Sequence, residues 1–301
     1  MRNACRDVVA PCRVKKGEMM ILEEHTGGIT ARLSDFNLNT ILLSGQCFRL
    51  KQVGAQKYDL VANGRYLEMH VTAPGQFFFS CSLEEFQTIW RPYFDLDTDY
   101  RSFCAHIPPQ DGYLQQAVCR CSGMKILRQQ PWEMLITFIL SQRKTIPAIA
   151  QCVESLSRRY GAPIQTPKGK IVYAFPCPEA LAARGEEELM ECALGYRAKY
   201  VLDASRRVAS GSLDLEALHA LDDETLEQTL CSIYGVGVKV ARCVMLYGYH
   251  RLAAVPIDTW MARIIQREYN GRFPYNWYGA QSGVLQQYMF LYERIYYGKE
   301  P

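Results

Sequence analysis

Hydrophobic and polar residues alternate with a period of two between about Phe36 and Cys81. The stretches "NTILLSGQCFRLKQ", "KYDLVANGRYLEMHV" and "QFFFSCS" are therefore predicted to be strands, because successive side chains of a strand point to opposite faces. The Asn63-Gly64 pair between two apolar runs is typical of a two-residue hairpin, since both positions tolerate positive φ. This part of the chain is predicted to form an antiparallel sheet.

Helical periodicity replaces the alternation after about Asp111 and continues to the end of the chain. A capping box at Ser82 and Glu85 begins one helix beside the sheet, and Pro131 begins another in "PWEMLITFILSQ". Further helices are predicted over 145–161, 178–194, 197–210, 223–233, 238–249, 259–269 and 280–297. The predicted fold class is α+β, with a sheet domain that includes helices over 31–120 and an all-α domain over 121–301. Residues 1–30 are predicted to form a loosely structured N-terminal extension.

Composition narrows the possible classes of protein. The chain has 301 residues, of which 49% are hydrophobic, and a formal net charge of +3. These values are ordinary for a globular protein, and they neither require nor exclude a nucleic-acid partner. The twelve cysteines contain no Cys-x-x-Cys motif, so neither a zinc site nor an iron–sulfur cluster is expected. The longest apolar run, "MLITFIL", is too short to span a membrane, and we expect a cytoplasmic protein with reduced thiols.

The stretch "SIYGVGVKVARC" places Gly235 and Gly237 between two predicted helices, with Lys239 in the first turn of the second. Glycines allow the backbone to turn tightly, and the free N–H groups at a helix start form an anion site that suits a DNA phosphate. The alternative is a tight helix–helix turn with no ligand. Partial burial and the helix dipole favour the neutral amine of Lys239, which is a nucleophile. The alternative for Lys239 is a surface lysine that contacts phosphate or buries only its stem.

Asp258 follows Val255-Pro256-Ile257 and precedes an amphipathic helix, so it is expected to be an N-cap in any case. It also lies 19 positions after Lys239. An aspartate held at a helix start near that lysine would stabilise positive charge on a sugar or transfer a proton.

These two motifs resemble the signature of the helix-hairpin-helix 8-oxoguanine DNA glycosylases. The blocks "LLSGQCFRL", "LRQQPWEMLITFILSQ", "LGYRAKYV", "GVGVKVARCV" and "QQYMF" occur in that family's order, and the resemblance covers roughly residues 36–296. It implies a sheet domain similar to the TATA-binding-protein fold, followed by a helical glycosylase core. It also implies a monomer that binds double-stranded DNA containing a damaged base, on the nucleoid if the source is bacterial.

The resemblance makes Lys239 the nucleophile that attacks C1′ of a flipped nucleotide and expels the base. The Schiff base that results permits β-elimination, so the protein would be a DNA glycosylase and an abasic-site (AP) lyase. Asp258 would stabilise the cationic sugar. The implied chemistry uses no metal, although the family implies a monovalent cation at the hairpin carbonyls.

The resemblance also implies a pocket for the flipped base. The Gly45 carbonyl would accept a hydrogen bond from N7–H of 8-oxoguanine, whereas N7 of guanine is itself an acceptor. Gln286 would contact the Watson–Crick edge, and the base would stack between Cys243 and Phe290. Considered alone, Gly45 is equally well a turn between strands, and Cys243 and Phe290 are more simply core residues.

Tyr196 and Arg197 match residues that wedge into the duplex where the base leaves it. Without the resemblance, Arg197 would be an exposed arginine that contacts phosphate.

Three positions depart from the family's pattern, namely Arg143-Lys144-Thr145, Ala148 and Trp260. Arg143 or Lys144 is expected to fill the gap left by the flipped base, and the base preferred opposite the lesion is left open. Two other functions are also left open. One is a glycosylase for another oxidised or alkylated base, and the other is a non-catalytic module that binds damaged DNA.

Overall fold

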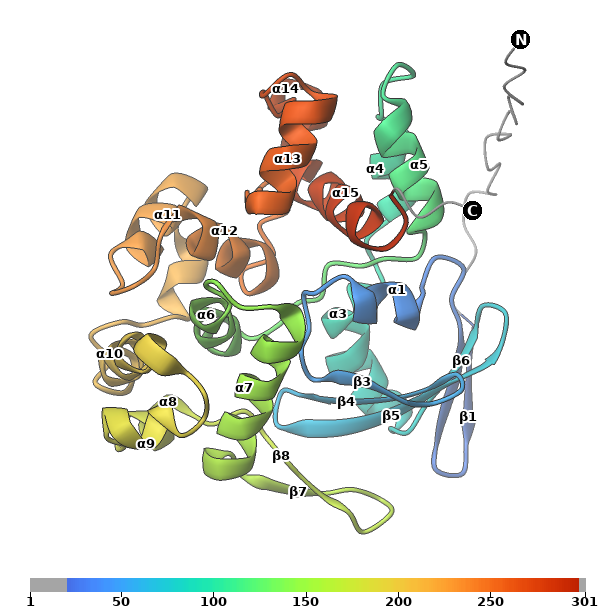
Figure 1. The fold of residues 1–301 in the computed structure, drawn as a ribbon. Coiled ribbons are helices and arrows are strands. Elements are labelled where there is room, and N and C mark those ends of the chain that lie inside the picture. The colour runs from blue at the N-terminus through green and yellow to red at the C-terminus, as the bar shows by residue number, and fades with distance from the viewer. Residues whose placement is uncertain (1–20, 298–301) are drawn as a thin grey trace.

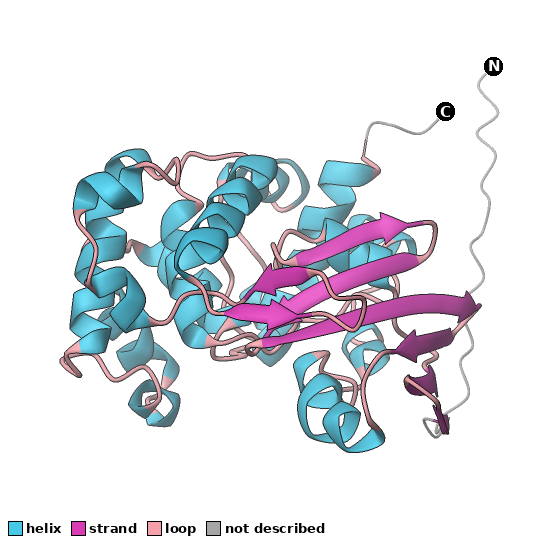
Figure 2. Cartoon of the chain, turned by 90° about the horizontal axis from the view of Figure 1, so that it is seen from below, coloured by secondary structure: helices cyan, strands magenta, loops and turns pink. Residues whose placement is uncertain are grey.

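The computed structural model describes residues 21–297. Its N-terminal part is a six-stranded antiparallel sheet with the strand order β1-β2-β6-β5-β4-β3. The strands are β1 (Ile21–His25), β2 (Gly28–Arg32), β3 (Leu50–Gly54), β4 (Lys57–Ala62), β5 (Arg65–Ala73) and β6 (Gln76–Phe79). Asn63 and Gly64 both have positive φ and join β4 to β5, which confirms the predicted hairpin. Figure 2 shows the strands side by side, with the larger group of helices beyond one end of the sheet.

The sheet begins earlier than the sequence predicts. Strands β1 and β2 fall within the first 32 residues, and Ile29 of β2 is fully buried opposite Phe79 of β6. The prediction of a loose extension is therefore wrong for residues 21–30, because β2 supplies part of the core beneath the sheet. The rest of that extension, residues 1–20, lies outside the described residues.

A helix replaces the first predicted strand. Helix α1 spans Leu38–Leu43, and the Asn37 side chain accepts a hydrogen bond from the Thr40 N–H as its N-cap. Leu38 and Ile41, three positions apart, are both buried, which fits a helix as well as the alternation fits a strand. The chain then runs through residues 44–49 without regular structure and enters β3 at Leu50.

One helical segment covers the sheet. It consists of α2 (Leu83–Glu85), a π-helical turn over Phe86–Trp90 and α3 (Arg91–Tyr93). The Ser82 side chain accepts from the Glu85 N–H, which is one half of the predicted capping box, while the Glu85 carboxylate accepts from Trp90 Nε1 over 3.0 Å. Phe86 and Trp90 are fully buried and pack with Phe79 in the core of the sheet.

The rest of the chain is largely helical, and the predicted α+β class is confirmed. The helices are α4 (Tyr100–Cys104), α5 (Gly112–Arg120), α6 (Pro131–Leu140), α7 (Ile146–Tyr160), α8 (Pro178–Ala182), α9 (Glu186–Met190), α10 (Ala198–Ala209), α11 (Asp223–Cys231), α12 (Val238–Tyr247), α13 (Thr259–Glu268), α14 (Tyr275–Tyr278) and α15 (Ser282–Ile295). None of the helices within residues 21–297 is long and apolar enough to cross a membrane. Each described cysteine is a free thiol.

The helical part differs from the prediction in three places. Strands β7 (Pro163–Gln165) and β8 (Ile171–Tyr173) form a small hairpin within the domain predicted to be all-α. The single helix predicted over 178–194 is two helices, because a new helix begins after Gly185. Helices α4 and α5 share the core of the helical part rather than that of the sheet, so the predicted boundary after residue 120 does not separate the two cores.

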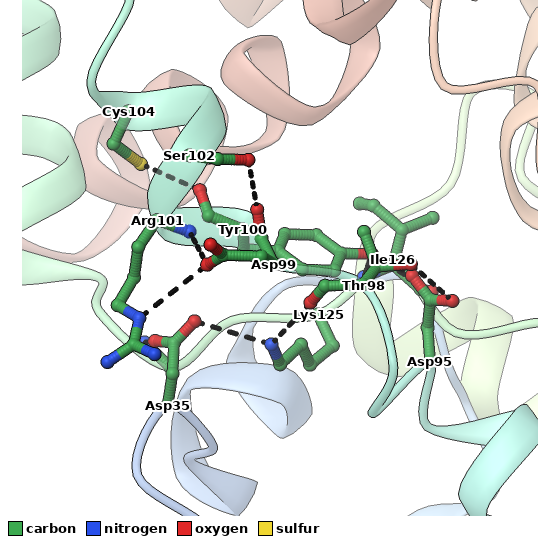
Figure 3. A network of polar contacts seen from close by, with 11 residues as sticks. Asp35, Asp95, Thr98, Asp99, Tyr100, Arg101, Ser102, Cys104, Lys125 and Ile126 are labelled. Atoms are coloured by element: carbon green, nitrogen blue, oxygen red, sulfur yellow. Dashed lines mark hydrogen bonds and ion pairs between the residues drawn. The ribbon is translucent and has the colours of Figure 1, made fainter. Parts of the chain in front are cut away.

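Buried polar contacts join the sheet part to the helical part (Figure 3). The Tyr100 hydroxyl donates to Asp95 Oδ2 over 2.8 Å and accepts from the Ile126 N–H over 2.9 Å. Lys125 Nζ lies 3.3 Å from Asp35 Oδ2 and 4.3 Å from the centroid of the Tyr100 ring. These contacts fix the segment that leads into α6.

Helix α6 lies among α7, α10 and α12 (Figure 1). Its residues from Met134 to Leu140 are all buried, which explains the unbroken apolar run in its sequence. The C-terminal end of α6 therefore reaches the hairpin between α11 and α12.

Candidate active site and DNA-binding surface

Lys239 lies where the hairpin meets the end of α6. Gly237 is the N-cap residue of α12, so Lys239 is the second residue of that helix. Its Nζ donates to Ser141 Oγ over 3.4 Å and lies 5.4 Å from the centroid of the Phe138 ring. The side chain is partly buried. The amine is thus held in a defined place with part of its surface open.

Asp258 is the N-cap residue of α13, as the sequence predicts. Its Oδ1 accepts from the Met261 N–H over 2.9 Å, and the residue is partly buried. Burial raises the pKa of the Cys243 thiol; Lys239 opposes this rise through its charge and a hydrogen bond, and the Asp258 charge adds to it. Lys239 therefore lies beside this buried thiol, one helical turn before it on α12, and the Asp258 charge reaches the same thiol.

Gly45 lies in the loop after α1 rather than in a turn between two strands. Its φ is +75°, and a Cβ there would lie 2.9 Å from Ile146 Cδ1 and 3.3 Å from Arg294 Nη1. Only glycine adopts this positive φ without strain and has no Cβ to clash with these neighbours. The fully buried Gln46 holds the loop, since its Nε2 donates to the Lys125 carbonyl over 2.7 Å and its Oε1 accepts from the Leu127 N–H over 2.8 Å.

Gln286 and Phe290 lie on α15, one helical turn apart. Gln286 is buried, and its Oε1 accepts from Gln287 Nε2 over 3.1 Å. Phe290 is partly exposed, and the guanidinium of Arg294 lies 5.1 Å from the centroid of its ring. Arg294 Nη1 also donates to the Leu43 carbonyl over 3.0 Å.

Arg294 therefore connects two predicted parts of the base pocket, the Gly45 loop and the Phe290 ring. Burial lowers the pKa of Arg294, and the Asp258 charge opposes this, so the acid is also nearby. Sequence reasoning does not identify Arg294, and its only local signal is its position four residues after Phe290.

The two hairpin glycines have different surroundings. Gly235 has a φ of +81°, and a Cβ there would lie 2.4 Å from the Tyr200 ring. Gly237 is exposed and has no heavy atom within 4 Å of the same point. Gly235 is therefore required by the fold, and Gly237 leaves open space at the N-terminus of α12.

The predicted DNA-contacting residues of the 141–145 turn also differ from one another. Arg143 is exposed with a positive φ of 51°. Lys144 Nζ donates to the Ala193 carbonyl over 2.9 Å, so Lys144 braces the turn against the segment before Tyr196. Tyr196 is 45% exposed, which leaves its ring available to a partner.

Arg197 is buried, so the prediction of an exposed arginine is wrong. Its Nε donates to the Gln142 carbonyl over 2.8 Å and its Nη1 donates to the Leu194 carbonyl over 3.1 Å. Gln142 Nε2 in turn donates to the Gly235 carbonyl over 2.9 Å. Sequence reasoning misses Gln142, because its role depends on contacts with residues far away in the chain.

Exposed apolar side chains surround the hairpin and the start of α13. Tyr234, Val238, Ile257 and Trp260 are each at least 38% exposed. Tyr200 packs edge-to-face on Tyr234 with the ring centroids 4.7 Å apart. This apolar surface lies beside the partly open Lys239 amine.

The fold and the site together define a helix-hairpin-helix DNA glycosylase. Residues 29–135 match the N-terminal domain of 8-oxoguanine DNA glycosylase, and residues 136–272 match the HhH-GPD superfamily of base excision DNA repair proteins. The structure of MBOgg1 in complex with a low-affinity DNA ligand is 36% identical, with a TM-score of 0.88, over 92% of this chain and 99% of that one. The chain belongs to the 8-oxoguanine DNA glycosylase family, as the sequence motifs predict.

Two further relatives show how far the similarity extends. The 8-oxoguanine glycosylase/lyase of Clostridium acetobutylicum, in complex with double-stranded DNA containing cytosine opposite 8-oxoguanine, is 32% identical with a TM-score of 0.85. That match covers 92% of this chain and 98% of the relative. An N-glycosylase/DNA lyase of Saccharomyces cerevisiae is 37% identical over 161 residues, which are 49% of this chain and 42% of the yeast protein. This chain thus matches less than half the length of the yeast relative.

Proposed function

We propose that this protein excises 8-oxoguanine from double-stranded DNA and then cuts the strand, as a DNA glycosylase with AP lyase activity. The observation that carries the proposal is the position of the Lys239 amine, which donates to Ser141 Oγ at the end of α6 and lies one helical turn before the buried Cys243 on α12. The names of relatives, N-glycosylase/DNA lyase and 8-oxoguanine glycosylase/lyase, support this substrate and these two activities.

Lys239 supplies the nucleophile. The lone pair of its neutral amine forms a bond to C1′ of the flipped nucleotide, while the C1′–N9 bond breaks and its electron pair leaves with the base, which takes up a proton. Loss of the amine proton and opening of the sugar ring then give a Schiff base. Removal of a 2′ proton breaks the C3′–O bond, and the 3′ phosphate leaves. Placing the amine before the substrate arrives lowers the entropic part of the barrier.

We assign Asp258 the role of stabilising the positive charge that develops on the sugar. Its Oδ1 caps α13, and we assign Oδ2 to the sugar and to the proton transfers. The N-cap hydrogen bond fixes the carboxylate without further groups. An aspartate at a helix start can therefore be held in place by one oxygen and face the sugar with the other.

The base pocket is assigned to Gly45, Cys243, Gln286 and Phe290. The Gly45 carbonyl accepts from N7–H of 8-oxoguanine and repels the N7 acceptor of guanine. Gln286 contacts the Watson–Crick edge. The flipped base stacks on the Phe290 ring, which is partly exposed in the free protein, with Cys243 on its other side.

The DNA backbone is assigned to the open N-terminus of α12 at Gly237, where free N–H groups suit a phosphate. Tyr196 is assigned to the duplex beside the flipped nucleotide, and the exposed Arg143 to the gap that the base leaves. Arg197 supports this surface from beneath through the Gln142 carbonyl. We place the protein in the cytoplasm, on the nucleoid if the cell is bacterial.

We further propose that a monovalent cation binds at the hairpin. The Ile233 carbonyl accepts from the Val236 N–H over 3.0 Å, and the Gly235 carbonyl accepts from Gln142. The remaining hairpin carbonyls are neutral oxygens, and such a set fits a singly charged ion better than a divalent one, which prefers carboxylates. The cation would bind DNA phosphate and takes no part in the chemistry.

Borohydride trapping tests the proposal. The protein is incubated with an 8-oxoguanine:cytosine duplex and sodium borohydride, which reduces the Schiff base to a stable adduct. Wild type and Lys170→Gln, an exposed lysine near the β7–β8 hairpin, should form the adduct, and Lys239→Gln should not. An adduct with another lesion but not with 8-oxoguanine would show that the other lesion, and not 8-oxoguanine, is the substrate. Binding without any adduct would indicate a damaged-DNA binding module instead.

A further inference from the structure

Arg294 occupies a position in the base pocket that neither the resemblance nor the mechanism assigns. It lies in the last turn of α15 and is partly buried. Its Nη1 donates to the Leu43 carbonyl over 3.0 Å, which joins α15 to the loop after α1 across 251 positions of sequence. In Figure 1 the end of α15 lies over α1.

The same guanidinium lies close to two residues of the proposed pocket, Phe290 and Gly45. It lies 5.1 Å from the centroid of the Phe290 ring, within the range of a cation–π contact. Its Nη1 is 3.3 Å from the point where a Gly45 side chain would begin. The ring on which the base stacks and the carbonyl that tests its N7 are therefore connected through one side chain.

Arginine suits this position better than lysine. Its planar guanidinium stacks on a ring and donates in its own plane at the same time, with the donors in a fixed fork. A lysine keeps the charge but has neither the plane nor the fork. Arg294 thus keeps the Leu43 carbonyl and the Phe290 ring at a fixed distance from each other.

We propose that Arg294 is a positioning residue for base recognition, which sets the Gly45 carbonyl relative to the Phe290 ring. The proposal rests on the proposed function of the pocket. A base that stacks on Phe290 then has its N7–H directed at the Gly45 carbonyl without further adjustment of the loop. Arg294 does not act on the sugar or on the Schiff base.

This role separates the two activities. Excision of 8-oxoguanine requires the base to be placed in the pocket. β-Elimination at an abasic site has no base to place and is assigned to Lys239 and Asp258. Loss of Arg294 should therefore slow excision far more than lyase activity at a preformed abasic site.

The test compares Arg294→Met and Arg294→Lys with wild type in single-turnover assays on an 8-oxoguanine:cytosine duplex and on an abasic duplex. Arg294→Met should lower the excision rate by about 10- to 100-fold, the scale of a small misplacement near a reacting centre. Arg294→Lys should give an intermediate rate, since it retains the charge. The lyase rate should match wild type in Arg294→Lys, which keeps the positive charge near Asp258, and should fall far less than the excision rate in Arg294→Met.

Arg267→Met is the matched control. Arg267 Nη1 and Nη2 donate to the two carboxylate oxygens of Glu293, over 2.9 and 2.8 Å. Glu293 is the residue that precedes Arg294. This variant removes an arginine from the same region without touching the pocket, so both rates should stay in their wild-type ratio.

Three results would overturn the proposal. They are an equal fall of excision and lyase rates in the Arg294 variants, an unchanged excision rate, or the same change of ratio in Arg267→Met. If Arg294→Met does not fold, the excision-to-lyase ratio of Arg294→Lys decides. Failure of the proposed function has a different signature, since wild type would then form no borohydride adduct with the 8-oxoguanine duplex, or Lys239→Gln would still form one, whatever happens at Arg294.

Discussion

Gly235 and Gly237 lie two positions apart in the hairpin, yet alanine should be costly at the first and tolerated at the second. A Cβ on Gly235 would lie 2.4–2.7 Å from three atoms of the Tyr200 ring, at a φ of +81°. At Gly237 the φ is −102° and the space is open. The difference comes from α10, which presses Tyr200 against the hairpin.

The expected loss has two parts. The left-handed backbone costs an alanine about 1–2 kcal/mol. The ring cannot move aside freely, because Tyr196 and Tyr234 both pack edge-to-face on it, and overpacking of this kind costs about 1–3 kcal/mol. Gly235→Ala should therefore lower the free energy of unfolding by about 2–5 kcal/mol. Gly237→Ala should lower it by only about 0.5–1 kcal/mol, because alanine is a poorer N-cap residue than glycine.

Urea unfolding of both variants measures this difference, and a double variant separates its parts. In a Tyr200→Ala background the clash is absent, so adding Gly235→Ala should cost only about 1–2 kcal/mol for the backbone. Equal free energies of unfolding for Gly235→Ala and Gly237→Ala would refute the reasoning. Gly237→Ala should nevertheless weaken DNA binding, because its methyl group would stand between the N-terminus of α12 and a phosphate.

Two other predictions concern buried hydrogen bonds. Gln142→Leu removes the bond to the Gly235 carbonyl, so borohydride trapping should slow while the melting temperature changes little; trapping at the wild-type rate would show that the hairpin holds Lys239 without it. Burial alone would raise the pKa of Asp95, but its hydrogen bonds and ion pairs, led by His250, lower it from 3.8 to about 2, so Asp95→Asn should cost about 2 kcal/mol at pH 7. Because the pKa is lowered on folding, this stability is present above pH 3.8 and is lost as the pH falls through about 2. Urea unfolding measures the difference in the free energy of unfolding between wild type and Asp95→Asn. A difference that does not narrow over this pH range would contradict the prediction.

The positions of Lys239 and Asp258 are largely predictable because their sequence signals are local. Lys239 follows two hairpin glycines, and Asp258 is placed by an N-cap whose partner is three residues away. Helix α6 is equally legible, since Pro131 begins it and its apolar run reflects burial on every side. The sequence signals of these features lie within one or two helical turns, although Lys239 also contacts Ser141, 98 positions away.

The features that the sequence does not reveal depend on distant partners or on competing local patterns. Arg197 appears in its motif as an exposed arginine, but it is buried by hydrogen bonds to Gln142, 55 positions away. The "NTILL" segment alternates like a strand, yet the Asn37 cap makes it the helix α1. Strand β2 has no clear signal in its own sequence and is recognised only from its pairing with β6, in which Ile29 lies opposite Phe79.

This division has a consequence for how such a protein changes its substrate. Lys239 and Asp258, to which we assign the covalent chemistry, are placed mainly by a local turn and a local cap. The base pocket instead depends on single long-range contacts, such as that of Arg294 with the Leu43 carbonyl. If the proposed pocket is correct, a change at one such contact should alter which base fits more than it alters the reaction at the sugar. Variation of lesion preference should therefore be found at pocket-positioning residues, while Lys239 and Asp258 stay the same.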